Sequence, residues 1–317
     1  MKLASAPVSW GVWERTVARH DLVAPEQLLE AVRWLGYRAI ELGPLGYFGA
    51  DRESVRALLG RSELELVGAF VPLQLSEDDD FRDLAATIEI LRGWPAVVLL
   101  ADAGTPERFA AAGRPDELRR TALRGAALDR AVARLASAAD RCRDAGLPAA
   151  LHPEVGSYVE APAEIETFLE RVDIDLCLDT GHTLIGSGDP LELAREWRER
   201  VRHVHLKDVS GPLLARLRAG ELDVEAAWEQ GLFCPFGEGE VDLDAVLAEL
   251  EGFPGWLVLE QDRVAVRPKD LEAVRQVEQR NLAFVCDRVP VSVGSSELTK
   301  SGGAGSAGAE ADSGARP

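Results

Sequence analysis

Eight short apolar runs alternate with longer amphipathic stretches along most of this chain, and that alternation constrains the fold more than any other feature. The runs are nearly continuous in hydrophobicity, which is typical of parallel strands covered by helices on both faces. They occupy residues 3–10, 38–43, 64–71, 96–102, 148–154, 174–181, 201–208 and 255–262. Eight strand–helix units within about 290 residues predict a single-domain (β/α)8 TIM barrel, here spanning residues 1–289.

The stretches between these runs carry helix start and stop signals. Pro25 opens one amphipathic stretch and Gly36 closes it, while Asp189 is placed as the N-cap of another. The predicted helices lie at residues 25–36, 116–146, 189–200 and 268–289. Each follows or precedes a predicted strand, as a barrel requires.

An open, doubly wound sheet is the structural rival of the barrel. Such folds usually place a glycine-rich phosphate loop, GxGxxG, after the first strand. Residues 8–15 read VSWGVWER instead, so the barrel is preferred. Residues 210–245 are longer than a simple helical connection, which predicts an elaborated loop after the seventh strand. Residues 290–317 are rich in Gly, Ser and Ala and are predicted to form a disordered tail outside the barrel.

Charge and composition exclude several classes of partner. The net charge of −19 repels nucleic acid and anionic membranes and favours a neutral or metal-bridged small molecule. No apolar run approaches the roughly 20 residues that span a bilayer, and no signal peptide is recognised. The four cysteines, far apart and without a CxxC pair, indicate reduced thiols in a cytoplasmic protein.

Polar side chains gather where the predicted strands end, and in TIM barrels the carboxyl ends of the strands form the active site. The strand ends carry Glu41, Asp102, His152, Glu154, Asp179, His182, His203, His205, Lys207, Asp208, Glu260 and Asp262. Carboxylates and imidazoles are ligands for divalent ions such as Mg²⁺, Mn²⁺ and Co²⁺. Four of these residues come from consecutive strands and are predicted to converge on one ion: Glu154, Asp179, His205 and Glu260.

Several strand-end residues have a plainer interpretation. His203 shares a strand face with His205 but lies one layer deeper, which favours a hydrogen-bonded interior histidine. Asp102 is equally compatible with a turn or N-cap role, and Asp208 and Asp262 are interpreted as loop caps. Lys207 faces carboxylates at the barrel mouth and therefore needs an anionic partner or a substrate oxygen.

Three aromatic residues near the strand ends leave two interpretations open. Trp10, Trp13 and Phe48 either line a substrate pocket or pack in the core, as large aromatics at strand ends usually do. Of the three, Trp10 is taken forward as a candidate substrate-binding residue.

Five motifs resemble a known family. They are GYRAIELGPLGYFG (36–49), LHPEVGSYVE (151–160), CLDTGH (177–182), RHVHLKDV (202–209) and GWLVLEQD (255–262). Falling in order at successive strand ends, they resemble the xylose isomerase-like TIM barrels over about residues 5–285, and within that family the inosose dehydratases. The resemblance implies a single divalent ion, Mn²⁺ or Co²⁺ with Mg²⁺ or Zn²⁺ as alternatives, held by the same four ligands.

The resemblance also implies an activity and roles for other residues. A dehydratase of this kind removes water from 2-keto-myo-inositol through an enediolate, with Glu154 or Glu260 as the base. Lys207 and Glu41 are then catalytic candidates, and His182, His152 and Trp10 substrate-binding candidates. The implied partner is a small polyol or keto-sugar, and a homo-oligomer is compatible with the sequence.

One departure keeps an alternative open. Glu154 stands where the dehydratases tend to have a histidine, whereas the sugar epimerases and isomerases of the family have a glutamate. A sugar or keto-sugar isomerase or epimerase on the same metal site is therefore the second expectation. A non-catalytic barrel that binds a polyol is the third, disfavoured because all four predicted ligands are intact.

Overall fold

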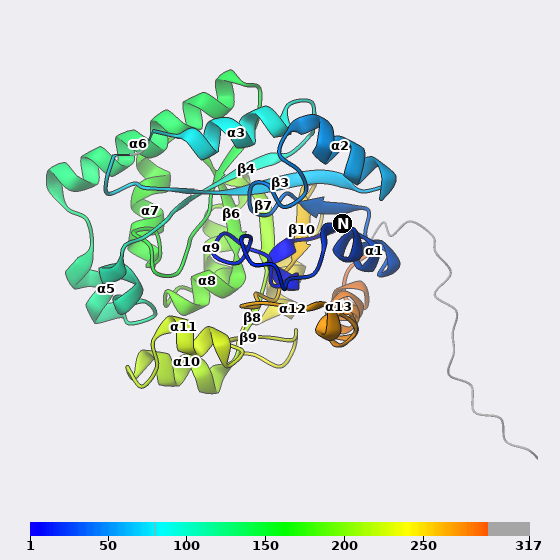
Figure 1. Cartoon of the computed structure of the whole chain (residues 1–317). Helices are drawn as coiled ribbons and strands as arrows, with labels where there is room; N and C mark the ends of the chain where they lie inside the picture. Colours follow the sequence, from blue (N-terminus) through cyan, green and yellow to red (C-terminus); the bar gives the residue numbers. More distant parts are fainter. Residues whose placement is uncertain (79, 291–317) are drawn as a thin grey trace, which may run out of the picture.

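The computed structural model describes residues 1–78 and 80–290, and within them eight parallel strands close into a barrel surrounded by helices (Figure 1). The barrel strands are β1 (Lys2–Ser5), β2 (Ala39–Glu41), β3 (Glu65–Leu73), β4 (Val97–Asp102), β5 (Ala149–Leu151), β6 (Asp175–Asp179), β7 (Val201–Leu206) and β10 (Trp256–Leu259). Ser5 pairs with both Leu259 and Ile40, so β1 joins β10 to β2 and closes the barrel. The predicted (β/α)8 fold is confirmed. The predicted tail, apart from Pro290, lies outside the described residues.

Helices cover the outside of the barrel in Figure 1 and follow the strands along the chain. They are α1 (Pro25–Trp34), α2 (Arg52–Arg61), α3 (Arg82–Leu91), α4 (Pro106–Ala111), α5 (Pro115–Thr121), α6 (Gly125–Asp144), α7 (Pro162–Arg171), α8 (Thr180–Ile185), α9 (Pro190–Glu196), α10 (Gly211–Arg218), α11 (Val224–Glu229), α12 (Leu243–Glu249) and α13 (Leu271–Cys286). In the described residues no helix combines the length and the apolarity that crossing a membrane requires.

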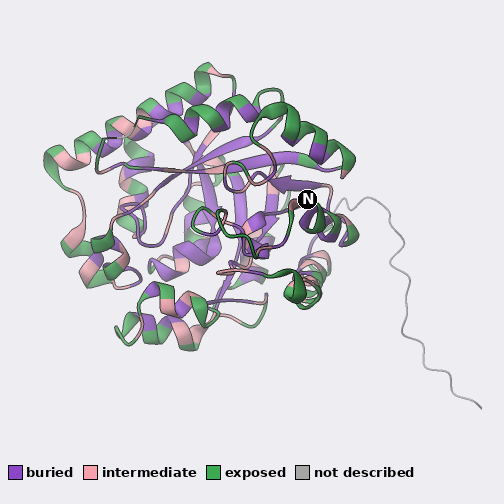
Figure 2. Ribbon diagram, viewed as in Figure 1, coloured by how far each residue is buried: buried purple, intermediate pink, exposed green. Residues whose placement is uncertain are grey.

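The helices form where the sequence supplies caps and an apolar face. Asp189 caps α9 by accepting the backbone N–H groups of Leu191 and Glu192, as predicted. In α7 the buried residues Ile165, Phe168 and Leu169 follow helical spacing and pack toward the barrel. Figure 2 shows the general result, with buried strands inside and exposed outer helix faces.

Two predicted elements differ from the structure. The helix predicted over residues 116–146 is two helices, α5 and α6, because Ala122 leaves the helical conformation and Gly125 has a φ of 51°. The strand predicted over residues 3–10 ends at Ser5. A 3₁₀ turn, Pro7–Trp10, follows it, since Pro7 has no N–H group to continue the ladder.

The elaborated loop predicted after the seventh strand is confirmed. It contains α10, α11 and a two-stranded antiparallel pair formed by β8 (Asp208–Val209) and β9 (Phe233–Cys234). Helices α10 and α11 lie beyond the carboxyl end of the barrel, away from the ring of outer helices (Figure 1). This segment therefore stands at the end of the barrel where the polar strand-end residues gather.

Candidate active site

A cavity of about 320 Å³ opens at the carboxyl ends of the barrel strands. Its polar lining consists largely of predicted site residues, namely Glu41, Asp102, His152, Glu154, His182, His205, Lys207, Glu260 and Asp262. Most of these side chains are buried in the protein. The structure thus brings residues from distant parts of the sequence to one acidic site at the end of the barrel.

At the floor of the site the Lys207 ammonium lies among three carboxylates. Its Nζ donates to Asp179 Oδ2 at 2.7 Å and lies 2.8 Å from Glu260 Oε2 and 3.5 Å from Asp262 Oδ2. We call Asp179, Glu260 and Asp262 the carboxylate cluster. Burial acts to lower the pKa of Lys207, but Asp179, Asp262 and Glu260 outweigh it and raise that pKa well above its ordinary value.

His205 joins the cluster to the barrel interior. Its Nε2 donates to Glu41 Oε1 at 3.0 Å, so its Nδ1 is the atom that faces Glu260 Oε2 at 3.1 Å and Asp179 Oδ2 at 3.5 Å. Burial acts to lower the pKa of His205, but its neighbours, among them Glu260 and Glu41, raise it well above its ordinary value. The imidazole is thus oriented by one carboxylate and presents its other nitrogen to two more.

Glu41, the charged residue at the end of β2, also pairs with His203. His203 Nε2 donates to the same Oε1 at 2.7 Å, and His203 is fully buried, as expected for an interior histidine. Burial acts to raise the pKa of Glu41, but His205 and His203 hold it well below its ordinary value. Gly68 makes this arrangement possible, because a Cβ there would lie 2.8 Å from Glu41 Oε1.

His152 separates Glu154 from the other predicted ligands. Its Nε2 lies 3.2 Å from His205 Nδ1 and 3.4 Å from Asp179 Oδ2, while its Nδ1 lies 3.4 Å from Glu154 Oε2. Asp179, His205 and Glu260 therefore form a compact group, and Glu154 lies beyond the His152 ring, where its role as a ligand stays a prediction. Burial raises the pKa of Glu154 to about 7, against the opposing effects of His182 and Lys207.

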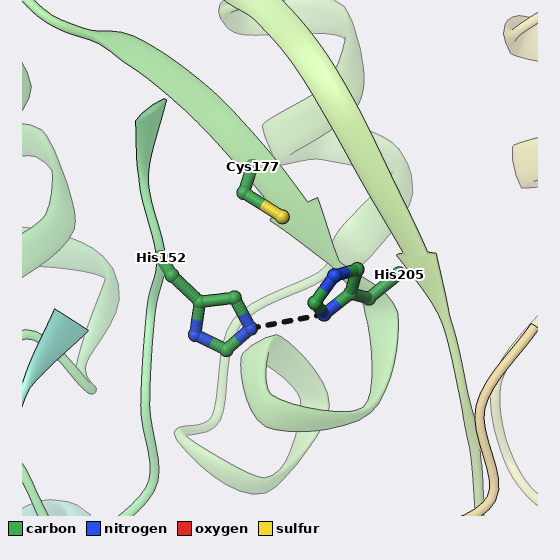
Figure 3. A group of neighbouring side chains, drawn as sticks. All are labelled: His152, Cys177 and His205. Carbon is green, nitrogen blue, oxygen red and sulfur yellow. Dashed lines mark hydrogen bonds between the residues drawn. The ribbon is translucent and has the colours of Figure 1, made fainter. Parts of the chain in front are cut away.

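Cys177 points toward the rings of His152 and His205, close enough for the three side chains to share an ion (Figure 3). It belongs to β6, two residues before Asp179, and is fully buried. Burial raises the pKa of its thiol to about 11, which keeps the sulfur protonated at neutral pH. A thiol in that state is a poor ligand for hard divalent ions.

His182 is fixed in one tautomer by the backbone. Its Nδ1 accepts the N–H of Val155 at 3.1 Å, so the ring proton is carried by Nε2, which lies 3.7 Å from Asp262 Oδ2. The N–H of His182 in turn donates to Asp179 Oδ1 at 2.8 Å, the N-cap bond of α8. A hydrogen-bond donor is therefore held at the cavity wall in a set direction.

Asp262 is the site residue that the sequence interpretation missed. A loop cap would accept backbone N–H groups, but the described residues contribute no hydrogen bond to Asp262 Oδ1, although this oxygen is buried. Its Oδ2 faces Lys207 and His182 instead. The signal was its position two residues beyond Glu260, because both side chains line the cavity.

Other buried acids hold loops in place by accepting their backbone N–H groups. We call these acids, Asp102, Glu160 and Asp208, the loop carboxylates. Asp208 accepts the N–H groups of Val209, Gly237, Gly239 and Val241, which confirms its predicted capping role. Asp102 accepts those of residues 75 and 158, and so holds turns as well as facing the cavity. Glu160 accepts those of residues 113 and 156, each at 2.7 Å.

Aromatic side chains form the outer part of the cavity. Trp13 stacks on Trp228 of α11 with ring centroids 4.7 Å apart, and Arg15 pairs with Glu225 of the same helix. Trp10 is instead fully buried outside this lining, and its Nε1 donates to Ser5 Oγ at 3.2 Å. The structure places Trp10 in the core, at the end of the 3₁₀ turn, whereas Trp13, three residues later, lines the cavity.

The donor set fits a hard or borderline divalent ion. Asp179, His205 and Glu260 each offer a ligand atom, and these atoms lie within 4.8 Å of one another. His205 donates its remaining N–H to Glu41, the arrangement that commonly orients a metal-binding histidine. The Lys207 ammonium lies 2.7 Å from Asp179 Oδ2 and 2.8 Å from Glu260 Oε2, so these two carboxylates already bind a cation.

Comparison with known proteins agrees with this architecture. The inosose dehydratase of Geobacillus kaustophilus (strain HTA426) is 29% identical over 282 residues, covering 84% of this chain and 90% of that protein. The rhizopine catabolism protein MocC of Rhizobium meliloti is 31% identical over 277 residues, covering 83% and 82%.

Solved structures share the fold at lower identity. The probable 3-DHS dehydratase AsbF of Bacillus anthracis superposes with a TM-score of 0.64 at 16% identity, covering 89% of this chain and 99% of that one. D-allulose 3-epimerase of Methylomonas sp. gives 0.63 at 17% identity, covering 91% and 97%. The model of the xylose isomerase-like TIM barrel family matches residues 29–279. This chain belongs to the xylose isomerase-like TIM barrel family.

Proposed function

We propose that this protein is a divalent-metal-dependent dehydratase that acts on 2-keto-myo-inositol. The observation that carries the proposal is the group of Asp179, His205 and Glu260 at the floor of a cavity lined by further acids and histidines. The relative named inosose dehydratase, which is similar over most of both chains, supports the substrate class.

The reaction begins with removal of a proton from a carbon next to a ketone. A divalent ion held by Asp179, His205 and Glu260 would supply stabilisation of the negative charge that develops on the ketone oxygen. Glu154 lines the cavity beyond the His152 ring and is the residue we assign as base.

Loss of the β-hydroxyl completes the dehydration, and that group leaves more readily when it is protonated. Lys207 is assigned as the proton donor, since its ammonium lines the cavity, while the neutral His182, whose Nδ1 accepts a backbone N–H, donates its Nε2–H to a substrate oxygen as a hydrogen bond. Lys207 adds positive charge on the same side of the cavity. Proton removal and proton delivery are thus assigned to different residues, as an elimination requires.

A metal-dependent assay tests the proposal. The protein is stripped with a chelator, restored with Mn²⁺ or Co²⁺ and mixed with 2-keto-myo-inositol while the absorbance of a conjugated diketone is followed. Absorbance that grows only with metal is the expected result. Folded, metal-loaded protein that produces no absorbance would contradict the proposed reaction.

A sugar or keto-sugar epimerase is the second candidate, and one observation favours it. Glu154 and Glu260 both line the cavity, so one carboxylate could remove a proton and the other return it. Incubation of a ketose panel in D₂O separates the two reactions. Deuterium incorporation without dehydration would support the epimerase, whereas a dehydrated product would exclude it as the main activity.

A further inference from the structure

Lys207 contacts two of the carboxylates that we assign to the metal site. Its Nζ contacts Asp179 Oδ2 at 2.7 Å and Glu260 Oε2 at 2.8 Å, and these are oxygens of two assigned metal ligands. An ammonium and a divalent ion repel each other, so an ion that binds through those oxygens competes with Lys207 for them. We therefore expect the Lys207 side chain to leave both carboxylates when the ion binds.

The displaced ammonium needs another anionic partner. Lys207 is 3% exposed, and a buried charge without a partner is strongly unfavourable. Asp262 is the nearest suitable group, since its Oδ2 already lies 3.5 Å from Nζ. Its Oδ1 is buried, and the described residues offer it no hydrogen bond, so the carboxylate has a free acceptor.

We propose that Asp262 is a positioning residue that receives the Lys207 ammonium when a divalent ion takes the Asp179 and Glu260 oxygens. The inference rests on the metal site of the proposed function, but not on its substrate. Glu154 is the other acid on this side of the cavity, but it lies farther from Nζ than Asp262 does and already faces His152 at 3.4 Å. Asp262 is nearer, at 3.5 Å from Nζ, and has a buried oxygen that no described residue satisfies.

The transfer has a consequence for the cavity. Both Lys207 and Asp262 line it, so an ammonium held by Asp262 remains beside the space that a substrate fills. Metal loading would thus convert Lys207 from a partner of the ligand carboxylates into a group that faces substrate oxygens. Asp262 would then determine the position of the Lys207 ammonium without contacting the metal ion.

A double-mutant cycle on metal affinity tests this inference. The affinity of the full chain for Mn²⁺ is measured by titration calorimetry for the wild type, Lys207→Met, Asp262→Asn and the double variant. We expect Lys207→Met to bind Mn²⁺ about tenfold more tightly, because no ammonium has to be displaced. Asp262→Asn should bind Mn²⁺ about tenfold more weakly than the wild type. In the Lys207→Met background the same substitution should change the Mn²⁺ affinity by less than about twofold.

Two outcomes would overturn the inference. If Asp262→Asn weakens Mn²⁺ binding equally in both backgrounds, Asp262 acts on the ion directly, and if it weakens binding in neither, Asp262 has no part in metal loading. Asp208→Asn is the matched control, a buried acid that binds backbone N–H groups and should leave the Mn²⁺ affinity unchanged. If Lys207→Met fails to fold, Lys207→Gln provides the same cycle with a polar side chain.

The double-mutant cycle and the dehydratase assay can fail independently of each other. A wild-type protein that binds Mn²⁺ and shows the cycle without dehydrating 2-keto-myo-inositol would contradict only the substrate assignment. A folded wild type that binds no Mn²⁺ at millimolar concentration would overturn the metal site and this inference together.

Discussion

Glu260 and Asp208 stand at the ends of neighbouring parts of the barrel, carry the same charge and are equally hidden from solvent, yet their partners differ in kind. Asp208 accepts four backbone N–H groups from residues 209, 237, 239 and 241. Glu260 Oε2 instead contacts two charged or chargeable side chains, Lys207 at 2.8 Å and His205 at 3.1 Å.

The difference separates structural acids from functional ones. Backbone donors are fixed by the fold, so a carboxylate oxygen that binds them holds a loop or caps a helix and cannot exchange partners. A side-chain ammonium can move, so an oxygen that binds it can accept an ion or a substrate group in its place. Each member of the carboxylate cluster has one oxygen that faces Lys207, whereas the loop carboxylates accept backbone N–H groups.

The largest expected effect is on turnover. Glu260→Gln removes the charge that we assign to metal binding, and we expect turnover to fall at least about a thousandfold with a loss of Mn²⁺ affinity. Steady-state kinetics and metal titration measure both quantities. Asp208→Asn serves as the comparison and should keep turnover within about threefold. Full activity in the Glu260 variant would abolish the distinction.

Next in size is the effect of removing the cation from the carboxylate cluster. In metal-free protein Lys207→Met leaves buried carboxylates without their partner, and we expect a loss of about 3–5 kcal/mol in the free energy of unfolding. That loss corresponds to a fall of about 10 °C in Tm. Added Mn²⁺ should restore much of it, measured by calorimetry. An unchanged Tm in the metal-free Lys207→Met variant would show that the ammonium does not stabilise the carboxylate cluster.

A pH titration tests a loop carboxylate. Burial raises the pKa of Glu160 to about 7, despite the opposing N–H groups of Gly113 and Gly156. A raised pKa means that the stabilising contribution is complete below the ordinary value of 4.5 and is lost as the pH rises through 7. Relative to Glu160→Gln, the wild type should lose about 3 kcal/mol of unfolding free energy over that range.

Denaturant unfolding at several pH values measures this loss for both proteins. Curves of unfolding free energy against pH that run parallel for the wild type and Glu160→Gln would show that two backbone donors suffice to keep the buried carboxylate ionised.

The smallest expected effect belongs to Asp208→Asn. An amide has one acceptor oxygen in place of two, so some of the four N–H groups lose their partner, at a cost of about 2 kcal/mol. Tm should fall by about 5 °C in a thermal melt. A Tm equal to that of the wild type would mean that the loop 237–241 does not depend on this carboxylate.

Much of the fold and part of the site follow from the sequence. The eight apolar runs predicted the barrel, and the rule that barrel sites lie at strand ends placed Asp179, His205 and Glu260 together. Local chain breaks were harder to foresee. The end of α5 depends on backbone conformations at Ala122 and Gly125 that helical periodicity does not reveal.

The remaining differences depend on long-range contacts. Asp208 and Asp262 both follow strand ends, and only the return of residues 237–241 to Asp208 makes one a cap and leaves the other facing the cavity. The separation of Glu154 from the other predicted ligands depends on where the His152 ring lies. Neither arrangement can be read from spacing along one strand.

The segment between β7 and β9 has a consequence for how this protein could diversify. Its part from residue 210 through β9 supplies Val224, Glu225, Trp228 and Phe233 to the cavity, while Lys207 and the acids and histidines of the floor come from the barrel strands and the residues directly after them. Substitutions or insertions within one continuous piece of chain could therefore reshape the recognition of a substrate while the reactive groups keep their positions. New specificities could evolve here, or be engineered, without rebuilding the chemistry.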